Sequence, residues 1–241
     1  MEQRLYTLLE QSRAAADQAL AEGLERPILQ LEAWQKQRLD HWYRDFTAQP
    51  RYRAATRFFI DELYAPRDLA QRDRDLSRMA PTMVHLLPDS TLKTVCQALE
   101  VQVLSLQLDM DLARQLGRLG IDPSRMDHDQ YAHGYRECGN RDQRVHQLEL
   151  ILSVGHALDV IVHRPMIYSA LKMARWPARL AGLAELQRFL EAGFSAFRAM
   201  DSADEFLAAI EMRESAVLNG IFDGPDNPLR GGVPGIPTAV Q

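Results

Sequence analysis

Apolar residues recur three and four positions apart along almost the whole chain, and no segment sustains the alternation of period two that is typical of a strand. This spacing collects apolar side chains on one face of a helix. We therefore predict an all-α protein. The longer predicted helices cover residues 3–21, 27–49, 51–63, 69–86, 92–116, 141–163, 183–200 and 202–222, with shorter ones after residue 127 and between residues 165 and 177.

Local signals place the ends of several helices. Pro66 follows the third helix, and proline disfavours helical geometry in the residue before it. Some short polar residues are followed three positions later by glutamine or glutamate, which resembles a capping box that satisfies backbone N–H groups at a helix start. Four such pairs precede predicted helices: Asp68 with Gln71, Asp127 with Gln130, Asn140 with Gln143, and Ser202 with Glu205.

The helices are expected to form one bundle-like domain of about eight to ten helices, because no repeat of fixed period and no long internal linker divides the chain. This domain is predicted to cover residues 1–222. Residues 223–241 are rich in glycine and proline and have no apolar periodicity. We therefore predict that they form a disordered tail.

Composition bounds the possible functions. With 241 residues and 46% hydrophobic content, the chain is long enough to bury a substantial core. Its 28 basic and 33 acidic residues give a formal charge of −5, so no general attraction for nucleic acid is expected. Cys96 and Cys138 lie far apart and belong to no CxxC pair, which argues against a disulfide framework or a cysteine-based zinc site.

The chain shows no sign of export or of a membrane span. Its start lacks the basic residues and continuous apolar run of a signal peptide. The longest apolar region, residues 148–162, is interrupted by Glu149, His156 and Asp159 and is too short to cross a bilayer comfortably. We therefore expect a cytoplasmic protein.

Several segments resemble an uncharacterised family of bacterial all-helical cytoplasmic proteins. The main one is the block Phe-Phe-x-x-x-Leu-Tyr at residues 58–64. The others are residues 31–39, 72–73, 86–88 and 182–191. Together they span most of the chain before the tail. The resemblance implies a bacterial cytoplasmic origin and an all-helical fold, and it implies no catalytic residue.

Arginines close to the aromatic block form the main candidate site for a small ligand. If the turn at residues 65–66 folds the flanking helices into a V, Arg67, Arg72 and Arg78 can converge on a phosphate or carboxylate, with Tyr64 as a hydrogen-bond donor. Acidic residues are interleaved with these arginines, and the alternative is that the charges neutralise one another within the chain. No cofactor is predicted.

Two groups of histidine and acidic residues are candidates for a metal site. His156, Asp159 and His163 are spaced by three and four, so they lie near one helical face and could ligate zinc or iron if another helix supplied a fourth ligand. The simpler interpretation is a hydrogen bond between the aspartate and a histidine, and no metal is predicted. The second group consists of Asp127, His128, Asp129 and His133. Its acids are explained by the helix start that they occupy.

The sequence contains no nucleophile elbow, phosphate loop, dinucleotide fingerprint or cysteine–histidine nucleophile signature, so no catalytic residue is predicted. We expect a non-enzymatic protein that acts by protein–protein interaction, with a regulatory role and a homodimeric state as further expectations. Trp34, Arg38 and Trp42 are the predicted interaction surface. The alternative is a helical sensor that binds a small ligand or cofactor in a cavity between helices.

Overall fold

The computed structural model describes residues 1–63, 77–81, 83–85, 88–173, 175–180, 182, 184–224 and 227–230. Within these residues the regular structure is helical and no strand occurs, which confirms the predicted all-α class. One segment predicted as a single helix, residues 27–49, is divided into two, and the break lies at Tyr43.

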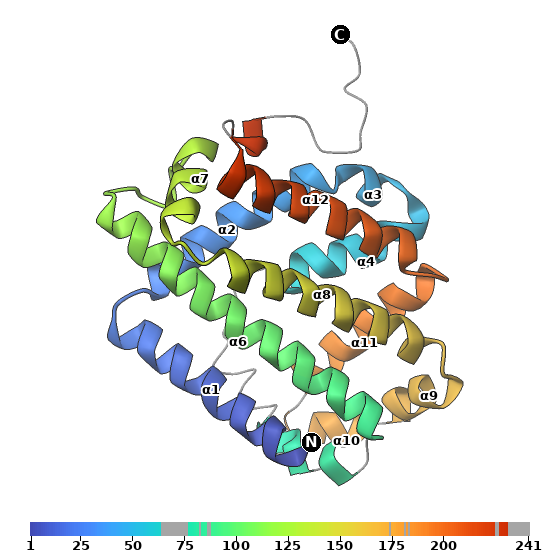
Figure 1. Ribbon diagram of the computed structural model, residues 1–241. Helices are drawn as coiled ribbons and strands as arrows, with labels where there is room; N and C mark the ends of the chain where they lie inside the picture. The colour runs from blue at the N-terminus through green and yellow to red at the C-terminus, as the bar shows by residue number, and fades with distance from the viewer. Residues whose placement is uncertain are drawn as a thin grey trace.

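The longest helices are α1 (Glu2–Ala21), α6 (Asp89–Arg118), α8 (Arg141–Val162) and α12 (Asp204–Asp223). They follow one another side by side from lower left to upper right in Figure 1. α1 and α6 run in the same direction, because Arg4 binds Glu100 at one end and Glu22 binds Arg114 at the other. α8 runs antiparallel to α6, and α12 runs antiparallel to α8 (Figure 1).

Shorter helices complete the domain behind this row and at its ends (Figure 1). In the N-terminal half these are α2 (Glu25–Trp42), α3 (Arg44–Ala48), α4 (Pro50–Phe58) and the π-helical turn η1 (Phe59–Leu63). In the C-terminal half they are α7 (His128–Glu137), α9 (Pro165–Met173), α10 (Arg175–Leu180), α11 (Ala184–Ala199) and the 3-10 turn η2 (Pro228–Arg230). α9 and α10 lie together at one end of the row, next to α11.

The main core lies where α2, α3, α4 and α12 meet. Trp42, Phe46, Tyr52 and Phe206 are each at most 5% exposed there. Phe46 packs edge-on against Tyr52 and Phe206, with ring centroids 5.1 Å and 5.6 Å apart. Each fully buried side chain of this size contributes about 1.5–3 kcal/mol to folding. Two smaller clusters bury the inner face of α1 against α6.

Two glycines allow close approach between helices. A Cβ atom added at Gly155 of α8 would lie 2.5 Å from the Leu207 side chain of α12, and one at Gly193 of α11 would lie 2.6 Å from the Phe58 ring of α4. Distances this short are excluded by van der Waals repulsion. Glycine at these positions therefore sets how tightly α8 packs on α12 and α11 packs on α4.

Among the described residues, α8 is long and apolar enough to cross a membrane when judged by length and composition alone. This is weak evidence for a membrane span, because the core helix of a soluble protein passes the same test. Its outward face carries the exposed polar residues His146, Glu149, Ser153 and His156. Other positions of α8 pack against α6, α11 and α12, while Val145 and Val160 are 39% and 60% exposed. Packing within this domain therefore accounts for part of the apolar surface of α8.

One of the predicted capping boxes is present. The Asp127 carboxylate accepts the backbone N–H groups of Asp129 and Gln130, and the Gln130 side chain accepts the N–H of Asp127. The predicted box at Asn140 is wrong, because its side chain makes no capping hydrogen bond although α8 begins directly after it. The predicted box of residues 68 and 71 lies outside the described residues.

The predicted box at Ser202 is also wrong. The residue before α12 is Ala203, and its N–H is accepted by the Asp159 carboxylate of α8 at 3.2 Å. Glu205 does not reach back to the helix start, because it accepts a hydrogen bond from the Tyr52 hydroxyl. The Ser202 hydroxyl accepts the Asp204 N–H at 3.2 Å, so this local contact and the tertiary contact from Asp159 together take the place of the predicted box.

The predicted start of the disordered tail, at residue 223, is wrong. α12 continues to Asp223, and η2 follows it with Leu229 only 3% exposed in the main core. Pro228 packs directly on Gly220 of α12. Residues 227–230 therefore belong to the packed domain. The predicted disorder of residues 231–241 lies outside the described residues.

Candidate functional site

Two of the predicted interaction residues, Arg38 and Trp42, lie inside the molecule. Trp42 is 2% exposed and belongs to the main core. The Arg38 side chain is 8% exposed, and its Nη2 donates to Glu214 Oε2 at 2.8 Å. The Tyr43 hydroxyl donates to the other oxygen of the same carboxylate at 3.0 Å. The prediction that Arg38 and Trp42 form an interaction surface is therefore wrong, because buried side chains cannot contact a partner.

The third predicted interaction residue, Trp34, holds α2 against α7. Its Nε1 donates to the backbone oxygen of Met126 at 2.9 Å, and its ring stacks on Tyr131 with centroids 4.3 Å apart. The His128 ring meets it edge-on at 5.6 Å. These contacts satisfy the indole N–H and cover part of the ring. Trp34 therefore has a structural role as well.

A second arginine, which the sequence analysis did not single out, is buried beside the first. Arg213 of α12 is 3% exposed, and its two Nη atoms donate to the Asp45 carboxylate at 2.9 Å and 2.7 Å. It also donates to the Trp42 carbonyl. Burial raises the pKa of Asp45, but the hydrogen bonds and charge of Arg213 outweigh burial, so this pKa lies below its usual value. The available signal was the position of Arg213, three residues after Ile210 on the buried face of α12.

Two carboxylates meet where α2 crosses α6. Gln35 donates to Asp109 Oδ1 at 3.2 Å, and both side chains are buried. Glu32 lies one helical turn before Gln35, and burial together with the charge of Asp109 raises the pKa of Glu32 to about 8. Arg144 approaches from α8 and donates to the Leu108 carbonyl at 3.1 Å. This site therefore favours a proton on Glu32 near neutral pH. Sequence reasoning missed it because its members come from separate helices.

Most of the predicted ligand site cannot be placed. Tyr64, Arg67 and Arg72 lie outside the described residues, and Arg78 is exposed in the short helical stretch 77–81. The arrangement of these four residues around a ligand therefore stays a prediction.

The arginines before the aromatic block bind groups of this chain. Arg51 Nε donates to the Met200 carbonyl at 2.7 Å, and Arg57 binds the Asp40 carboxylate at 3.1 Å. The Arg57–Asp40 pair agrees with the alternative in which the charges of this region are neutralised internally.

The candidate metal residues on α8 serve other purposes. The Asp159 carboxylate accepts the Ala203 N–H, and the Nδ1 atom of His163 lies 2.7 Å from the backbone oxygen of Asp159 rather than from its carboxylate. His156 is exposed on the outer face of α8. Within the part of the chain that the structure describes, no three His, Cys, Asp or Glu side chains are grouped so as to hold a metal ion.

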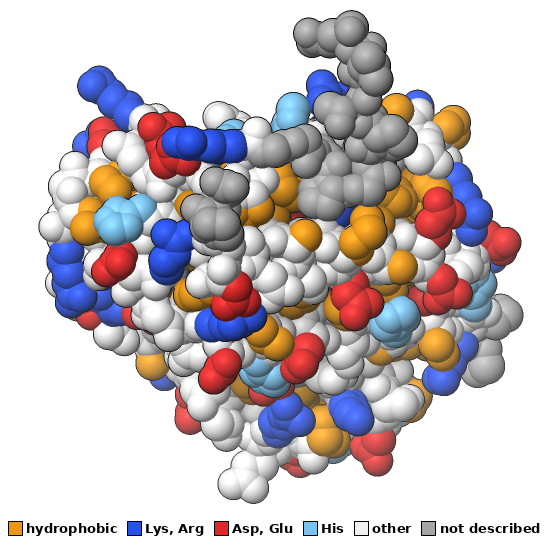
Figure 2. Space-filling view, turned by 45° about the horizontal axis from the view of Figure 1, so that its top comes forward, with side chains coloured by type: hydrophobic (Ala, Val, Ile, Leu, Met, Phe, Trp, Pro, Cys, Tyr) orange, Lys and Arg blue, Asp and Glu red, His pale blue; other side chains and the backbone are white. Residues whose placement is uncertain are grey.

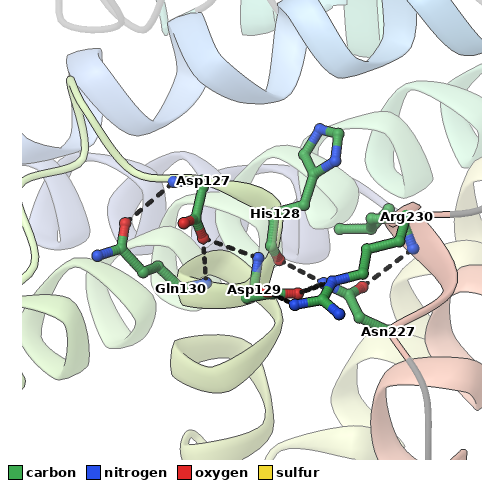
Figure 3. Close-up of polar contacts among 7 residues, drawn as sticks. Asp127, His128, Asp129, Gln130, Asn227 and Arg230 are labelled. Atoms are coloured by element: carbon green, nitrogen blue, oxygen red, sulfur yellow. Dashed lines mark hydrogen bonds and ion pairs between the residues drawn. The ribbon is translucent and has the colours of Figure 1, made fainter.

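The second group of acids and histidines joins α7 to the end of the domain (Figure 3). Arg230 and Asn227 both donate to Asp129 Oδ1, at 2.7 Å and 2.9 Å, and Asn227 also donates to the His128 carbonyl. The hydrogen bond from Arg230 lowers the pKa of Asp129. His133 is exposed on α7. Asp129 therefore fastens η2 to α7, a contact that the sequence interpretation did not include, while the predicted role of Asp127 at the helix start is confirmed.

Large apolar side chains are most exposed at the end of the molecule formed by α9 and α10. Met173 is 79% exposed and Trp176 is 70% exposed, more than any other large hydrophobic residue that the structure describes. The other two tryptophans, Trp34 and Trp42, are packed against the core. By contrast, the face shown in Figure 2 mixes basic, acidic and apolar side chains.

Basic side chains accompany the two exposed apolar residues. Lys172 directly precedes Met173, and Arg179 lies three residues after Trp176. Both cations are exposed and form no ion pair within the described part of the chain. We call Lys172, Met173, Trp176 and Arg179 the α9–α10 surface. The sequence signal for it is the absence of any acidic residue between positions 159 and 185.

Contacts to α11 fix this surface. Arg175 of α10 binds Glu191 through two nitrogen atoms, and its hydrogen bonds lower the pKa of Glu191 to about 2. Gln187 donates to the Leu171 carbonyl near the end of α9 at 2.6 Å and to the same glutamate at 2.8 Å. α9 and α10 are therefore held side by side by two neighbouring residues of α11.

A shallow open groove of about 400 Å³ runs between α1 and α6. Its walls carry the amides of Gln11, Gln18 and Gln107, next to Leu8 and Leu104. The one acidic residue that lines it, Glu100, is bound by Arg4. His146 of α8 also lines it, so the groove offers mainly amide hydrogen-bonding groups with one imidazole.

A family profile described as a domain of unknown function (DUF8198) matches residues 13–228. This match confirms the predicted relationship to an uncharacterised family, while the predicted bacterial origin stays a prediction. No curated protein and no solved structure matches the chain. The matched residues include both the buried arginines and the α9–α10 surface.

Proposed function

The chain belongs to the DUF8198 family of unknown function, and we propose that it is a non-enzymatic protein-interaction domain that binds a partner protein through the α9–α10 surface. The observation that carries the proposal is the exposure of Met173 and Trp176, at 79% and 70%, on a scaffold that packs its other tryptophans against the core. Tryptophan, methionine and arginine are the residue types enriched at protein interfaces. Tryptophan and arginine also dominate binding energy.

Covering these two side chains supplies favourable free energy for association. Removing a side chain of this size from water is worth about 1.5–3 kcal/mol. The contacts of Arg175 with Glu191 and of Gln187 with Leu171 fix the underlying helices before any partner arrives. A surface that is already ordered loses less conformational entropy on binding.

Two further expectations about function stay predictions. Self-association is one form of the proposal, in which the partner is a second copy of the chain. The sensor alternative stays a prediction, because three of its four ligand-binding residues, Tyr64, Arg67 and Arg72, lie outside the described part of the chain.

Site-specific photo-cross-linking in the native cell tests the proposal. A photoreactive residue is placed at Met173, and in a control protein it is placed at Leu20 of α1, which is 60% exposed. We expect a protein adduct from position 173 and none from position 20, with an adduct of twice 27.4 kDa identifying a second copy. Equal labelling from both positions, or no protein adduct from position 173, would show that the α9–α10 surface binds no protein.

A further inference from the structure

The charge around the α9–α10 surface is opposite in sign to that of the whole chain. The formal charge of the protein is −5, yet the segment between Asp159 and Glu185 contains four basic residues and no acidic one. These residues are Arg164, Lys172, Arg175 and Arg179. An isolated stretch of one sign is a local electrostatic feature that the overall composition hides.

One of these four cations forms an ion pair among the described residues. The charge of Arg175 is taken up by Glu191. Arg164, Lys172 and Arg179 are exposed and have no ion pair among the described residues. Lys172 stands over the Tyr168 ring, with its Nζ atom 4.3 Å from the ring centroid, and its charge also helps to lower the pKa of Glu191 without forming an ion pair.

Arginines elsewhere in the domain show that acidic partners are available to the fold. The ion pairs include Arg38 with Glu214, Arg114 with Glu22, Arg141 with Asp223, and Arg213 with Asp45. A molecule that covers Trp176 also removes water from the cations beside it. This loss of solvation is offset if the covering molecule supplies negative charge.

We infer, building on the proposed function, that the partner of the α9–α10 surface is an acidic amphipathic protein segment. Its apolar residues cover Met173 and Trp176, and its carboxylates pair with Lys172 and Arg179. Two apolar side chains on short helices are a small anchor for a lipid bilayer, which binds helices with a continuous apolar face. They are sufficient for a protein interface, where a few central residues carry most of the energy.

The experiment uses the full chain and the partner segment recovered by cross-linking from position 173. Lys172→Glu/Arg179→Glu reverses the two unpaired charges of the surface. The control Arg13→Glu/Lys93→Glu makes the same change of net charge at two exposed residues of α1 and α6. Circular dichroism verifies that both variants are folded, and the change in Trp176 fluorescence on adding the segment gives the dissociation constant Kd.

We expect the surface variant to raise Kd by at least about 30-fold and the control by less than about 3-fold, because charge pairs at an interface are worth more than charges at a distance. Added salt should weaken wild-type binding steeply and binding by the surface variant only slightly. A cross-linked segment without an excess of acidic residues, or equal Kd values for the two variants, would overturn the inference and leave the interaction surface itself in place.

Vesicles that contain an anionic phospholipid provide the second arm of the test. We expect no change in Trp176 fluorescence when they are added at the lipid concentrations that saturate peripheral membrane proteins. Vesicle binding that is lost in the Lys172→Glu/Arg179→Glu variant, without a protein adduct from position 173, would assign the surface to membranes and overturn both proposals.

Discussion

The region around α12 and the α9–α10 surface use the same residue types in opposite ways. Beside α12, Trp42 is buried and Arg213 is paired with Asp45. On the α9–α10 surface, Trp176 is 70% exposed and Arg179 has no ion pair in the described chain. Residue type alone therefore does not separate a structural site from a binding site. The difference lies in whether each side chain finds its partner within the chain.

Physical cost explains this division. A buried charge without a partner costs several kcal/mol, so a buried arginine must be paired in the folded protein. An exposed arginine keeps its hydration and needs no partner. Unpaired cations beside exposed apolar side chains are therefore stable in the free protein and remain available for a contact with another molecule.

The largest difference between the two regions is expected for arginine. Arg213→Ala leaves the Asp45 carboxylate and the Trp42 carbonyl without their donor, so the free energy of unfolding should fall by about 3–5 kcal/mol. Arg179→Ala removes only an exposed charge and should change it by less than about 0.5 kcal/mol. Urea unfolding followed by circular dichroism measures both. Similar losses in the two variants would show that Arg179 is part of the folded framework.

A smaller difference is expected for tryptophan. Trp42→Phe shortens a fully packed side chain and leaves a cavity, which should cost about 2 kcal/mol. Trp176→Phe opens no cavity, so its free energy of unfolding should match the wild type within about 0.5 kcal/mol. The same urea titrations apply. A destabilised Trp176→Phe protein would mean that the indole packs against the chain in solution.

The acid pair of α2 and α6 should produce a pH dependence. The pKa of Glu32 is raised from 4.5 to about 8, so the folded state binds this proton more tightly than the unfolded state does. Stability is therefore lost as the pH rises between these two values. Glu32→Gln should be more stable than the wild type by up to about 4 kcal/mol above about pH 8, and equally stable near about pH 4. Thermal unfolding across this range measures the difference, and a constant offset would exclude the protonated Glu32.

The smallest change in stability is expected for the surface itself. Met173→Ala/Trp176→Ala removes two exposed side chains and should alter the free energy of unfolding by less than about 0.5 kcal/mol. Binding of the cross-linked partner segment should nevertheless weaken by at least about 100-fold, as expected for central interface residues. Isothermal titration calorimetry measures the binding, and urea unfolding measures the stability, so the two effects are separated. Tight binding by this variant would place the partner elsewhere on the domain.

Periodicity predicts the helices well because it depends on neighbouring residues, whereas only one of the three capping boxes within the described residues is complete. The capping box of Asp127 and Gln130 is correct, since its two residues are three positions apart. The assignment of Arg38 and Trp42 to a surface fails because their burial depends on Glu214 and α12, far along the chain. Local pattern fixes which face of a helix is apolar, but it does not show which other helix covers that face.

The same limit applies to the surroundings of single side chains. Ser202 and Glu205 carry a capping pattern, yet the N–H at residue 203 is taken by Asp159 of another helix. The exposure of Trp176 could not be predicted from its short helix either, because a tryptophan three residues after Met173 and four before Leu180 resembles a core residue. The absence of acidic residues between positions 159 and 185 is the feature of the sequence that marks this surface.

One experiment decides whether the α9–α10 surface is a binding site. A photoreactive residue at Met173 is compared between the otherwise native protein and a Lys172→Glu/Arg179→Glu variant of equal thermal stability, in the same cells. We expect a single partner adduct in the first protein and at least about ten-fold less of it in the second. Equal adduct yields would contradict recognition by charge, and the absence of any protein adduct from both would contradict the proposed function.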